Sequence, residues 1–294
     1  MTTTPMPDRS PVAEPPPPPR VRARYDDGLA VYHRAASVEP ATTVVYVHGA
    51  MDRAASFIRA VRRRPLLDVI RYDRRGYGRS VGIGFCATVD DQVDDLITVL
   101  DGRPAVVVGH SLGGVIALRA AGRAPDLVQS VAAFEAPLWT SDESTSEAER
   151  DRADAEARSD PEAAAERFMR RMIGDDAWRA LPESTRATRR AEGPALISDL
   201  EAVRAAATQQ AATPVAVPVI VGYGTRSSER HQASARNLAQ RTPGAALVAI
   251  DGAGHDAHRT HPDDFAAFVD LAVDAAVSRS TAADQVPNGA RCSG

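Results

Sequence analysis

The sequence contains no lysine, because all 35 basic residues among its 294 are arginine. This absence excludes chemistry that needs a lysine amine, such as a Schiff base or a lysine general base. The two cysteines, Cys86 and Cys292, lie far apart in the sequence. A disulfide-stapled secreted fold is therefore not expected, and two thiols alone cannot complete a four-ligand zinc site.

Long apolar runs and a surplus of positive charge are also missing. No segment approaches the roughly 18 apolar residues of a transmembrane helix. Residues 1–20 lack the apolar stretch of a signal peptide. The net charge of −4 offers no basic surface for nucleic acid or an anionic membrane. We therefore expect a cytoplasmic protein with no membrane span and no nucleic-acid partner, and its oligomeric state stays open.

Both ends of the chain differ in composition from its middle. Residues 1–20 hold eight of the 21 prolines, five of them consecutive at Pro15–Pro19. Such a run favours an extended polyproline helix that does not join a packed core. Residues 280–294 are polar and rich in small side chains. We expect a disordered leader at 1–20 and a disordered tail at 280–294.

The remaining chain alternates short β-rich runs with helical patterns. Strand–helix alternation of this kind favours an α/β fold with a mostly parallel sheet covered by helices on both faces. The first two strands are expected to form a hairpin around Asp26-Asp27-Gly28. The eight expected strands are 21–25, 29–33, 42–48, 67–73, 104–110, 127–135, 217–223 and 245–251, and helices are expected near 54–64, 89–100, 112–124, 232–241 and 262–278.

Residues 137–213 interrupt this alternation, because they contain no convincing strand. Ser159-Asp160-Pro161-Glu162 has the pattern of a helix start and precedes the helical run AAAERFMRRMIG. We interpret 137–213 as a helical insertion into a sheet domain formed by 21–136 and 214–279. Trp139, Phe168, Met169, Met172, Ile173 and Trp178 are its larger apolar residues.

The strongest chemical signal is Gly109-His110-Ser111-Leu112-Gly113, followed by Gly114. It lies between an apolar strand and a helical run, the context in which a G-x-S-x-G motif is informative. The serine must occupy a tight, strained turn, and the flanking glycines let strand and helix approach without Cβ clashes. The helix N-terminus would then point its free N–H groups toward the serine.

With three further motifs, the chain resembles the α/β-hydrolase family. These are His48-Gly49-Ala50, the segment Asp73–Ser80 that matches D-x-R-G-x-G-x-S in full, and Gly252-Ala253-Gly254-His255. The resemblance implies the α/β-hydrolase fold, with an eight-stranded sheet and a helical lid between the sixth and seventh strands. The insertion at 137–213 falls at that place.

The resemblance also implies roles for individual residues. Ser111 is the expected nucleophile and His255 its general base, since a serine hydroxyl needs an adjacent base at neutral pH. The backbone N–H groups of Ala50 and Leu112 are expected to form the oxyanion hole. His48 and His110 occupy motif positions that are usually structural.

The acidic member of the triad is where this sequence departs from the family. The family commonly places an aspartate after the seventh strand, as G-x-x-D, but Thr225 stands at that position. Glu135 ends the sixth strand between apolar residues, and a carboxylate there needs a partner. Glu229 is the alternative acid, although its arginine neighbours favour a surface ion pair equally well.

A metal site is not expected, although His255, His258 and His261 are spaced like ligands, because no acidic or thiol partner completes that set in the sequence. The resulting hypothesis is a serine hydrolase, without a cofactor, that cleaves an ester, thioester or lactone of a small molecule through an acyl-enzyme on Ser111. The alternatives are a binding protein of the same fold without turnover, a cofactor-free haloperoxidase or perhydrolase, and a carbon–carbon bond hydrolase.

Overall fold

A computed structural model describes residues 21–36, 42–137, 154–209 and 215–284 of the chain. The leader 1–20, residues 138–153 of the insertion and residues 285–294 lie outside this described part, and so does Trp139.

The eight predicted strands form one sheet, ordered β1-β2-β4-β3-β5-β6-β7-β8. β2 runs antiparallel to both of its neighbours, β1 and β4, and all other neighbouring strands are parallel. The predicted hairpin is present: Asp26 pairs with Leu29, and Asp27 and Gly28 both have positive φ, as a two-residue type I′ turn requires. The strands are β1 Val21–Asp26, β2 Leu29–Arg34, β3 Thr43–Val47, β4 Asp68–Tyr72, β5 Ala105–His110, β6 Val128–Phe134, β7 Val219–Gly224 and β8 Ala246–Ile250.

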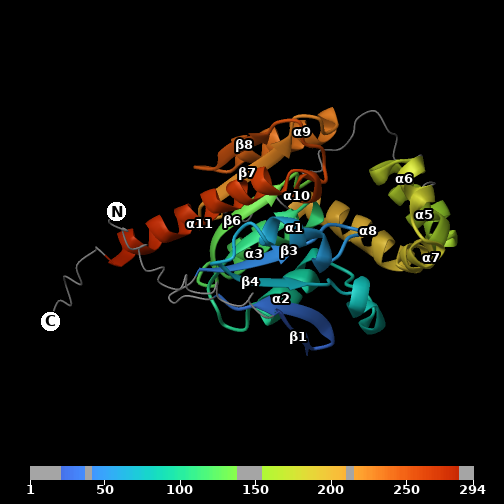
Figure 1. Cartoon of the computed structure of the whole chain (residues 1–294), viewed down its shortest axis with the longest axis horizontal. Helices are drawn as coiled ribbons and strands as arrows, with labels where there is room; N and C mark the ends of the chain where they lie inside the picture. The colour runs from blue at the N-terminus through green and yellow to red at the C-terminus, as the bar shows by residue number, and fades with distance from the viewer. Residues whose placement is uncertain (1–20, 37–41, 138–153, 210–214, 285–294) are drawn as a thin grey trace, which may run out of the picture.

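Helices cover both faces of this sheet (Figure 1). One face packs against α2 (Val89–Leu100), α3 (Leu112–Arg123) and α9 (Glu229–Arg241), through valine, leucine and alanine side chains. The other face packs against α1 (Ile58–Val61) and α11 (Pro262–Asp284), where Phe57, Phe265 and Phe268 are fully buried. The central strands are apolar on both sides because both of their faces are covered.

Three short helices complete the loops of the sheet domain. The 3-10 helices η1 (Ala54–Phe57) and η2 (Gly78–Ile83) follow β3 and β4, and α10 (Ala257–Thr260) follows β8. Helix α11 continues to Asp284, so the expected disordered tail from residue 280 is wrong for its first five residues. The described residues include no helix long and apolar enough to cross a membrane.

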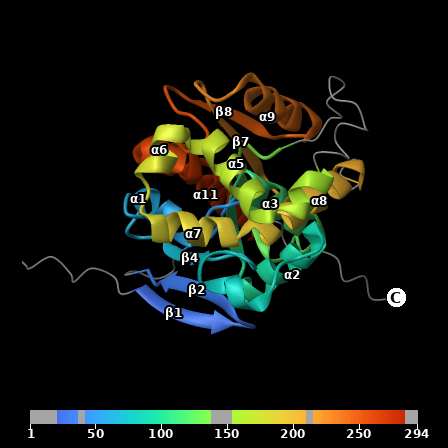
Figure 2. The same ribbon diagram turned by 90° about the vertical axis from the view of Figure 1, so that its right-hand side faces the viewer.

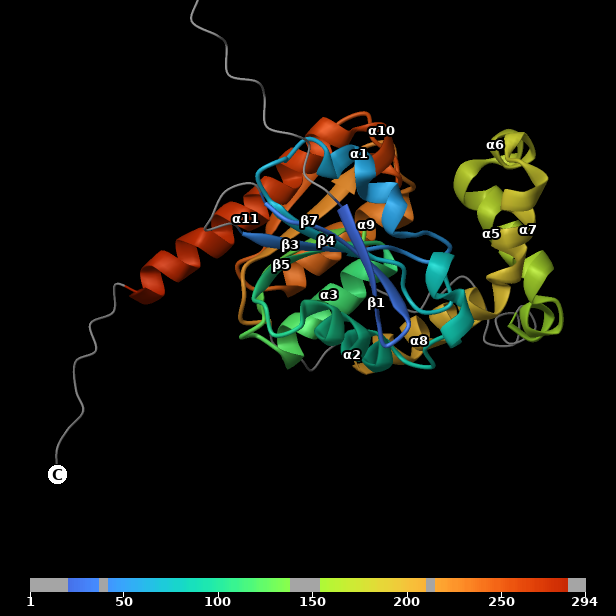
Figure 3. The ribbon, with the colours of Figure 1, turned by 60° about the horizontal axis from the view of Figure 1, so that its bottom comes forward.

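The first helices between β6 and β7 form a group beyond one end of the sheet (Figure 3), which lies in front of the sheet in Figure 2, whereas the last of them runs back beside α2 and α3. Residues 154–159 are helical, and α5 (Pro161–Ile173), α6 (Asp175–Ala180), α7 (Glu183–Ala191) and α8 (Gly193–Gln209) follow. The predicted cap and proline at the start of α5 are present, since the Asp160 carboxylate accepts from Ala163 N. A small apolar cluster joins this group to the sheet domain, formed by Met51, Tyr77, Ala165, Met169, Trp178, Ala195 and Leu196.

Candidate active site

Ser111 lies in a sharp turn between β5 and α3. Its backbone has φ 53° and ψ −125°, a conformation that costs a non-glycine residue roughly 1–3 kcal/mol and is concentrated at functional sites. The Ser111 amide donates to the Phe134 carbonyl of β6, and its carbonyl accepts from Gly114 N, both at 2.8 Å. Neighbouring elements therefore hold the turn in its strained shape and leave the side chain half-exposed.

The glycines around Ser111 are required by close backbone contacts. A Cβ at Gly113 would overlap the Val47 carbonyl at the end of β3, and one at Gly109 would overlap the Gly113 carbonyl. A Cβ at Gly49 would lie 3.0 Å from the Ser111 Cβ. The loop after β3 is thus packed directly against the serine.

This packing brings the two expected oxyanion donors to the Ser111 turn. Ala50 follows Gly49 in the loop after β3. Leu112 is the first residue of α3, so its N–H has no carbonyl partner within the helix. An N–H group at a helix start lies in the positive field of the helix, which favours a negative charge nearby.

Glu135 and His255 form the central hydrogen-bonded pair of the site. The His255 Nδ1 lies 2.6 Å from Glu135 Oε2, and Glu135 Oε1 accepts from Gly224 N at 2.8 Å. Glu135 directly follows β6, where it adopts φ 48° and its own amide donates to the Gly222 carbonyl. Since a carboxylate only accepts, the proton of the neutral imidazole is on Nδ1 and Nε2 is free to act as a base.

The buried Glu135 carboxyl, 1% exposed, is held in its ionised form. Burial alone would raise its pKa, but the hydrogen bond and charge of His255, together with the Gly224 N–H, outweigh burial and hold the pKa below its usual range. A buried carboxylate of this kind fixes the ring of the histidine and stabilises it when it becomes positive.

The alternative acid, Glu229, lies elsewhere. It is the first residue of α9, its side chain is 81% exposed, and it pairs with Arg236 at 3.2 Å. Thr225, at the position where an aspartate was expected, has a hydroxyl 3.1 Å from Asp251 Oδ1. The structure therefore brings Glu135, and not Glu229, to His255.

A second histidine, which the sequence did not single out, lies against His255. The rings of His231 and His255 are stacked, with centroids 4.3 Å apart and planes 12° apart. His231 Nδ1 lies 3.6 Å from Glu135 Oε2 and 3.1 Å from the Ser228 hydroxyl. Burial, followed by the charge of His255, lowers the pKa of His231 to about 4.

The three histidines spaced like metal ligands do not come together. His261 bonds Thr260, while His255 bonds Glu135. His258 instead lies beside His110 and Asp52, and each of these three residues offers one ligand atom within 4.8 Å of the others. The missing acidic partner thus comes from a distant part of the chain, which spacing alone could not reveal.

Asp73, which is buried, lies between the loops after β3 and β4. Its carboxylate accepts from the backbone N–H groups of Ala54 and Arg79, at 2.8 and 3.0 Å, and from the Tyr32 hydroxyl at 3.1 Å. The neighbouring Arg74 and Arg75 pair with Asp199 and Asp95 instead. Asp73 therefore fixes the loops after β3 and β4 directly through their backbones.

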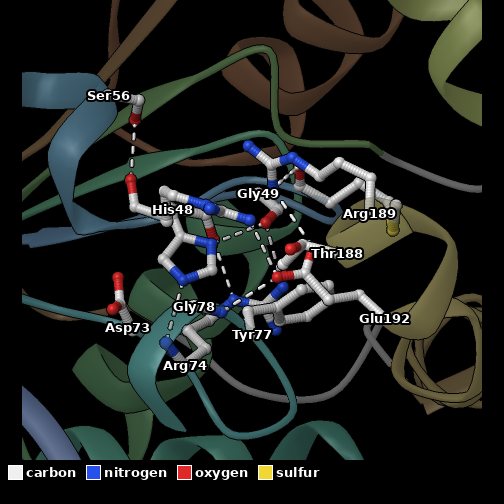
Figure 4. A network of polar contacts seen from close by, with 12 residues as sticks. His48, Gly49, Ser56, Asp73, Arg74, Tyr77, Gly78, Thr188, Arg189 and Glu192 are labelled. Atoms are coloured by element: carbon white, nitrogen blue, oxygen red, sulfur yellow. Dashed lines mark hydrogen bonds and ion pairs between the residues drawn. The ribbon is translucent and has the colours of Figure 1, made fainter. Parts of the chain in front are cut away.

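The inserted helices are tied to the loops beside Ser111 by buried polar contacts. Figure 4 shows Glu192, which is 1% exposed, between Gly78 and Arg189. Its carboxylate accepts from Gly78 N at 3.0 Å and from Arg53 at 2.8 Å. Arg189 donates to the Met51 carbonyl at 2.8 Å. The loop after β3 is therefore held from the side of the insertion as well.

A second buried contact joins α8 to the sheet domain. The Arg74 guanidinium, 2% exposed, binds both carboxylate oxygens of Asp199, at 2.7 and 3.1 Å. The same guanidinium donates to the carbonyls of His48 and Gly49 at 2.9 and 3.0 Å. This arginine thus connects the insertion to the motif that precedes Ala50.

Comparison with known proteins identifies the family. A sequence model of the Alpha/beta hydrolase family matches residues 44–268. A pimeloyl-[acyl-carrier protein] methyl ester esterase of Chromobacterium violaceum is 32% identical over 186 residues, 60% of this chain and 72% of that protein. Lipase LipV of Mycobacterium tuberculosis is 33% identical over 91 residues, which cover 30% of this chain and 34% of the lipase.

Solved structures show the same fold. An enol-lactonase from Burkholderia xenovorans superposes with a TM-score of 0.67 at 22% identity, over 86% of this chain and 99% of that one. An alpha/beta hydrolase from Sphaerobacter thermophilus gives 0.64 at 26% identity, over 84% and 99%. The chain belongs to the alpha/beta hydrolase family and is a hydrolytic enzyme of that kind.

Proposed function

We propose that the protein is a serine hydrolase that cleaves an ester, thioester or lactone of a small molecule through an acyl-enzyme on Ser111. The observation that carries this proposal is the 2.6 Å pair between His255 Nδ1 and the buried Glu135 carboxylate, at the same edge of the sheet as the strained Ser111 turn. A paired imidazole, a partly exposed serine and free helix N–H groups are the parts that acyl transfer requires.

The proposed roles rest on the pair of His255 and Glu135 and on the motif positions of Ser111, Ala50 and Leu112. Ser111 Oγ attacks the acyl carbonyl while His255 Nε2 takes the hydroxyl proton and then gives it to the leaving alcohol or thiol. Glu135 keeps the imidazole oriented and balances its positive charge without taking the proton. The N–H groups of Ala50 and Leu112 stabilise the oxyanion, and each such donor is worth about 10²–10³ in kcat by analogy with a protease.

Water completes the cycle. His255 removes a proton from water, the hydroxide attacks the acyl-enzyme, and Ser111 regains its proton as the carboxylic acid leaves. The reaction consumes one water and needs no cofactor. The names of the relatives, a methyl ester esterase and an enol-lactonase, support an ester or lactone as the substrate.

We propose further that the insertion acts as the lid of this site and selects the substrate. Its contacts with the loops after β3 and β4, through Arg189 and Glu192, support this proposal. Met51 and Met169 bury apolar surface between the two parts. Inserted elements commonly line the pocket of an enzyme.

The decisive experiment combines covalent labelling with turnover. We expect a fluorophosphonate to label Ser111 stoichiometrically and p-nitrophenyl esters of short acids to be hydrolysed. Ser111→Ala should lose labelling and lower kcat by about 10⁴–10⁶. A folded protein that is neither labelled nor active against esters, thioesters and lactones would refute the proposal. Chain-length series of each substrate class would then define the preference.

A further inference from the structure

A buried group of one carboxylate and two imidazoles lies beside the catalytic residues and takes no part in the proposed reaction. Asp52 comes from the loop after β3, His110 from the residue before Ser111, and His258 from α10 after β8. His110 is 5% exposed and His258 is 1% exposed. The Asp52 side chain is 19% exposed, so the group is closed on its histidine side and reachable from the carboxylate side.

The hydrogen bond of His110 leaves one ring nitrogen as a bare acceptor. Its Nε2 lies 2.7 Å from the His255 carbonyl, which only accepts, so Nε2 carries the proton. The other nitrogen, Nδ1, is therefore unprotonated and carries a lone pair. It is buried, and it has no hydrogen-bond partner among the described residues. A metal-binding histidine usually donates its second ring N–H to a carbonyl or carboxylate in this way.

His258 is more exceptional, because neither of its ring nitrogens has a hydrogen-bond partner in the described part of the chain. The imidazole packs between Phe57 and Phe265, with centroids 4.9 and 5.8 Å away. Leaving a buried polar group without a hydrogen bond is destabilising. One of the two nitrogens, Nε2, faces the Asp52 carboxylate without reaching hydrogen-bond distance, so a ligand can bind between them.

The spacing between His258 and Asp52 fits a shared ion better than a direct bond. Their Nε2 and Oδ2 atoms are 3.6 Å apart, too far for a hydrogen bond. Two ligands around a tetrahedral ion with bonds near 2.0–2.1 Å lie about 3.3–3.4 Å apart. By contrast, the catalytic pair of His255 and Glu135 meets at 2.6 Å, as a direct hydrogen bond should.

The orientation of the two rings also allows a shared ion. The planes of His110 and His258 are 51° apart, with centroids at 4.5 Å, so the two rings are not stacked in parallel.

The second group of possible ligands, Glu135, His231 and His255, lacks these properties. The rings of His231 and His255 are nearly parallel, so their in-plane lone pairs cannot converge on one ion without a rotation. Glu135 and His255 already satisfy each other, and the Ser228 hydroxyl lies within hydrogen-bond distance of His231.

We propose that Asp52, His110 and His258 form a binding site for a divalent transition metal of the Zn²⁺ type. Two imidazole nitrogens and one carboxylate oxygen are the ligand types that zinc prefers, with water as the fourth ligand. The ion would tie together the loops that carry Ala50, Ser111 and His255. Its role is to stabilise their arrangement, and the site is separate from the proposed acyl transfer and does not depend on it.

The test is a zinc titration of untagged full-length protein that has been treated with chelator and dialysed. We expect one Zn²⁺ per chain by calorimetry and by elemental analysis after gel filtration. Free Zn²⁺ at about 100 times Kd should raise Tm by about 5 °C or more. Co²⁺ should bind at the same stoichiometry. It should show the visible absorption bands of a low-symmetry site with two nitrogen ligands and one carboxylate ligand from the protein.

Variants assign the ion to these residues. Asp52→Asn keeps the size of the side chain, and His258→Gln provides a second probe in case one of the two fails to fold. Each should weaken zinc binding at least about tenfold and abolish the Co²⁺ bands. His231→Gln and His261→Gln are the matched controls and should leave Kd within about twofold.

The outcomes are distinct. Absence of stoichiometric zinc, or an unchanged Kd in both folded Asp52→Asn and His258→Gln, overturns the site. Loss of binding in His231→Gln also overturns it, because the ion would then sit on the catalytic pair. Fluorophosphonate labelling of the metal-free protein reports on the serine separately, so failure of the metal site leaves the hydrolase proposal intact.

Discussion

The sheet domain and the inserted helices are held together in different ways. In the sheet domain, apolar side chains fill both faces of the sheet, and the central strand β5 is buried at every residue. In the insertion, α7 buries no residue completely and α5 buries only Ala165 and Met169. Its helices are joined instead by arginine–carboxylate pairs, such as those of Glu166 with Arg170 and Arg190.

This difference in packing affects how firmly each region holds its residues in place. A close-packed sheet resists small displacements, and so it can hold Ser111 and Glu135 in strained backbone conformations. The insertion contacts the sheet domain through a small apolar cluster and a few buried ion pairs, and α8 adds Ala202, Val203 and Ala206 to the main core. Individual contacts can therefore be broken to ask which region controls catalysis and which controls stability.

The largest effect should come from the acid in the sheet domain. Glu135→Gln removes the charge that orients His255, and a comparable change in a serine protease lowers kcat about 10⁴-fold. The measurement is kcat on the best ester substrate. Glu229→Gln, an exposed carboxylate paired with Arg236, is the control and should stay within about twofold of the parent. Equal losses in both variants, or near-full kcat in Glu135→Gln, would remove Glu135 from the triad.

The next largest effect should come from the buried link between the two regions. Asp199→Asn leaves the 2% exposed Arg74 without its countercharge, and breaking a buried pair costs about 3–5 kcal/mol. We expect Tm to fall by roughly 10 °C. Glu201→Gln on the same helix is the matched control, because its pair with Arg158 is 45–55% exposed. If both variants melt alike, Arg74 is stabilised by something other than Asp199.

This buried pair is also an example of a contact that the sequence alone does not predict. The strands, their order of appearance and most helices were predicted because apolar runs and turn residues are local signals, as in the Asp27-Gly28 hairpin. The pair of Glu135 and His255 was predictable only because β6 runs beside β5 in a parallel sheet. Arg74 and Asp199 are 125 residues apart, and nothing in either segment indicates the other.

The same limit applies to the histidines. Their positions in the sequence suggested a group of His255, His258 and His261, but α10 turns His258 toward Asp52 and His110. His231 lies in α9 and reaches His255 only through the packing of α9 beside β7. Local patterns thus identified the catalytic elements, whereas the neighbours of each side chain depended on how distant helices pack.

The next prediction concerns how the stability of the sheet domain depends on pH, through His231 of α9. His231 has a pKa near 4, below its ordinary 6.5, because of burial and the charge of His255. The unfolded chain therefore binds more protons between pH 6.5 and 4, and stability must fall as pH falls through that window. The loss should be on the order of 1–2 kcal/mol after screening of a side chain that is 30% exposed.

Replacing His231 tests this assignment. His231→Phe keeps the stacked ring and removes the titrating group, so its stability should fall less between pH 6.5 and 4 in urea denaturation. His261→Gln, which changes a partly exposed histidine bonded to Thr260, should follow the parent. Parallel pH curves for the parent and His231→Phe would mean that another group carries the acid sensitivity.

The smallest effect belongs to the ion pairs within the insertion. Hydrogen bonds from Arg190 and Arg170 lower the pKa of Glu166 to about 2, so its contribution is complete above its ordinary value of 4.5 and is lost as pH falls toward 2. Because the three side chains are 23–33% exposed, solvent screens the pairs.

Glu166→Gln should lower Tm by no more than a few degrees at pH 7. In 1 M salt, where the screening length is about 3 Å, the difference in Tm should be smaller still. A larger, salt-independent loss would show that the insertion depends on Glu166 as the sheet domain depends on its apolar core, and the contrast between the two regions would then fail.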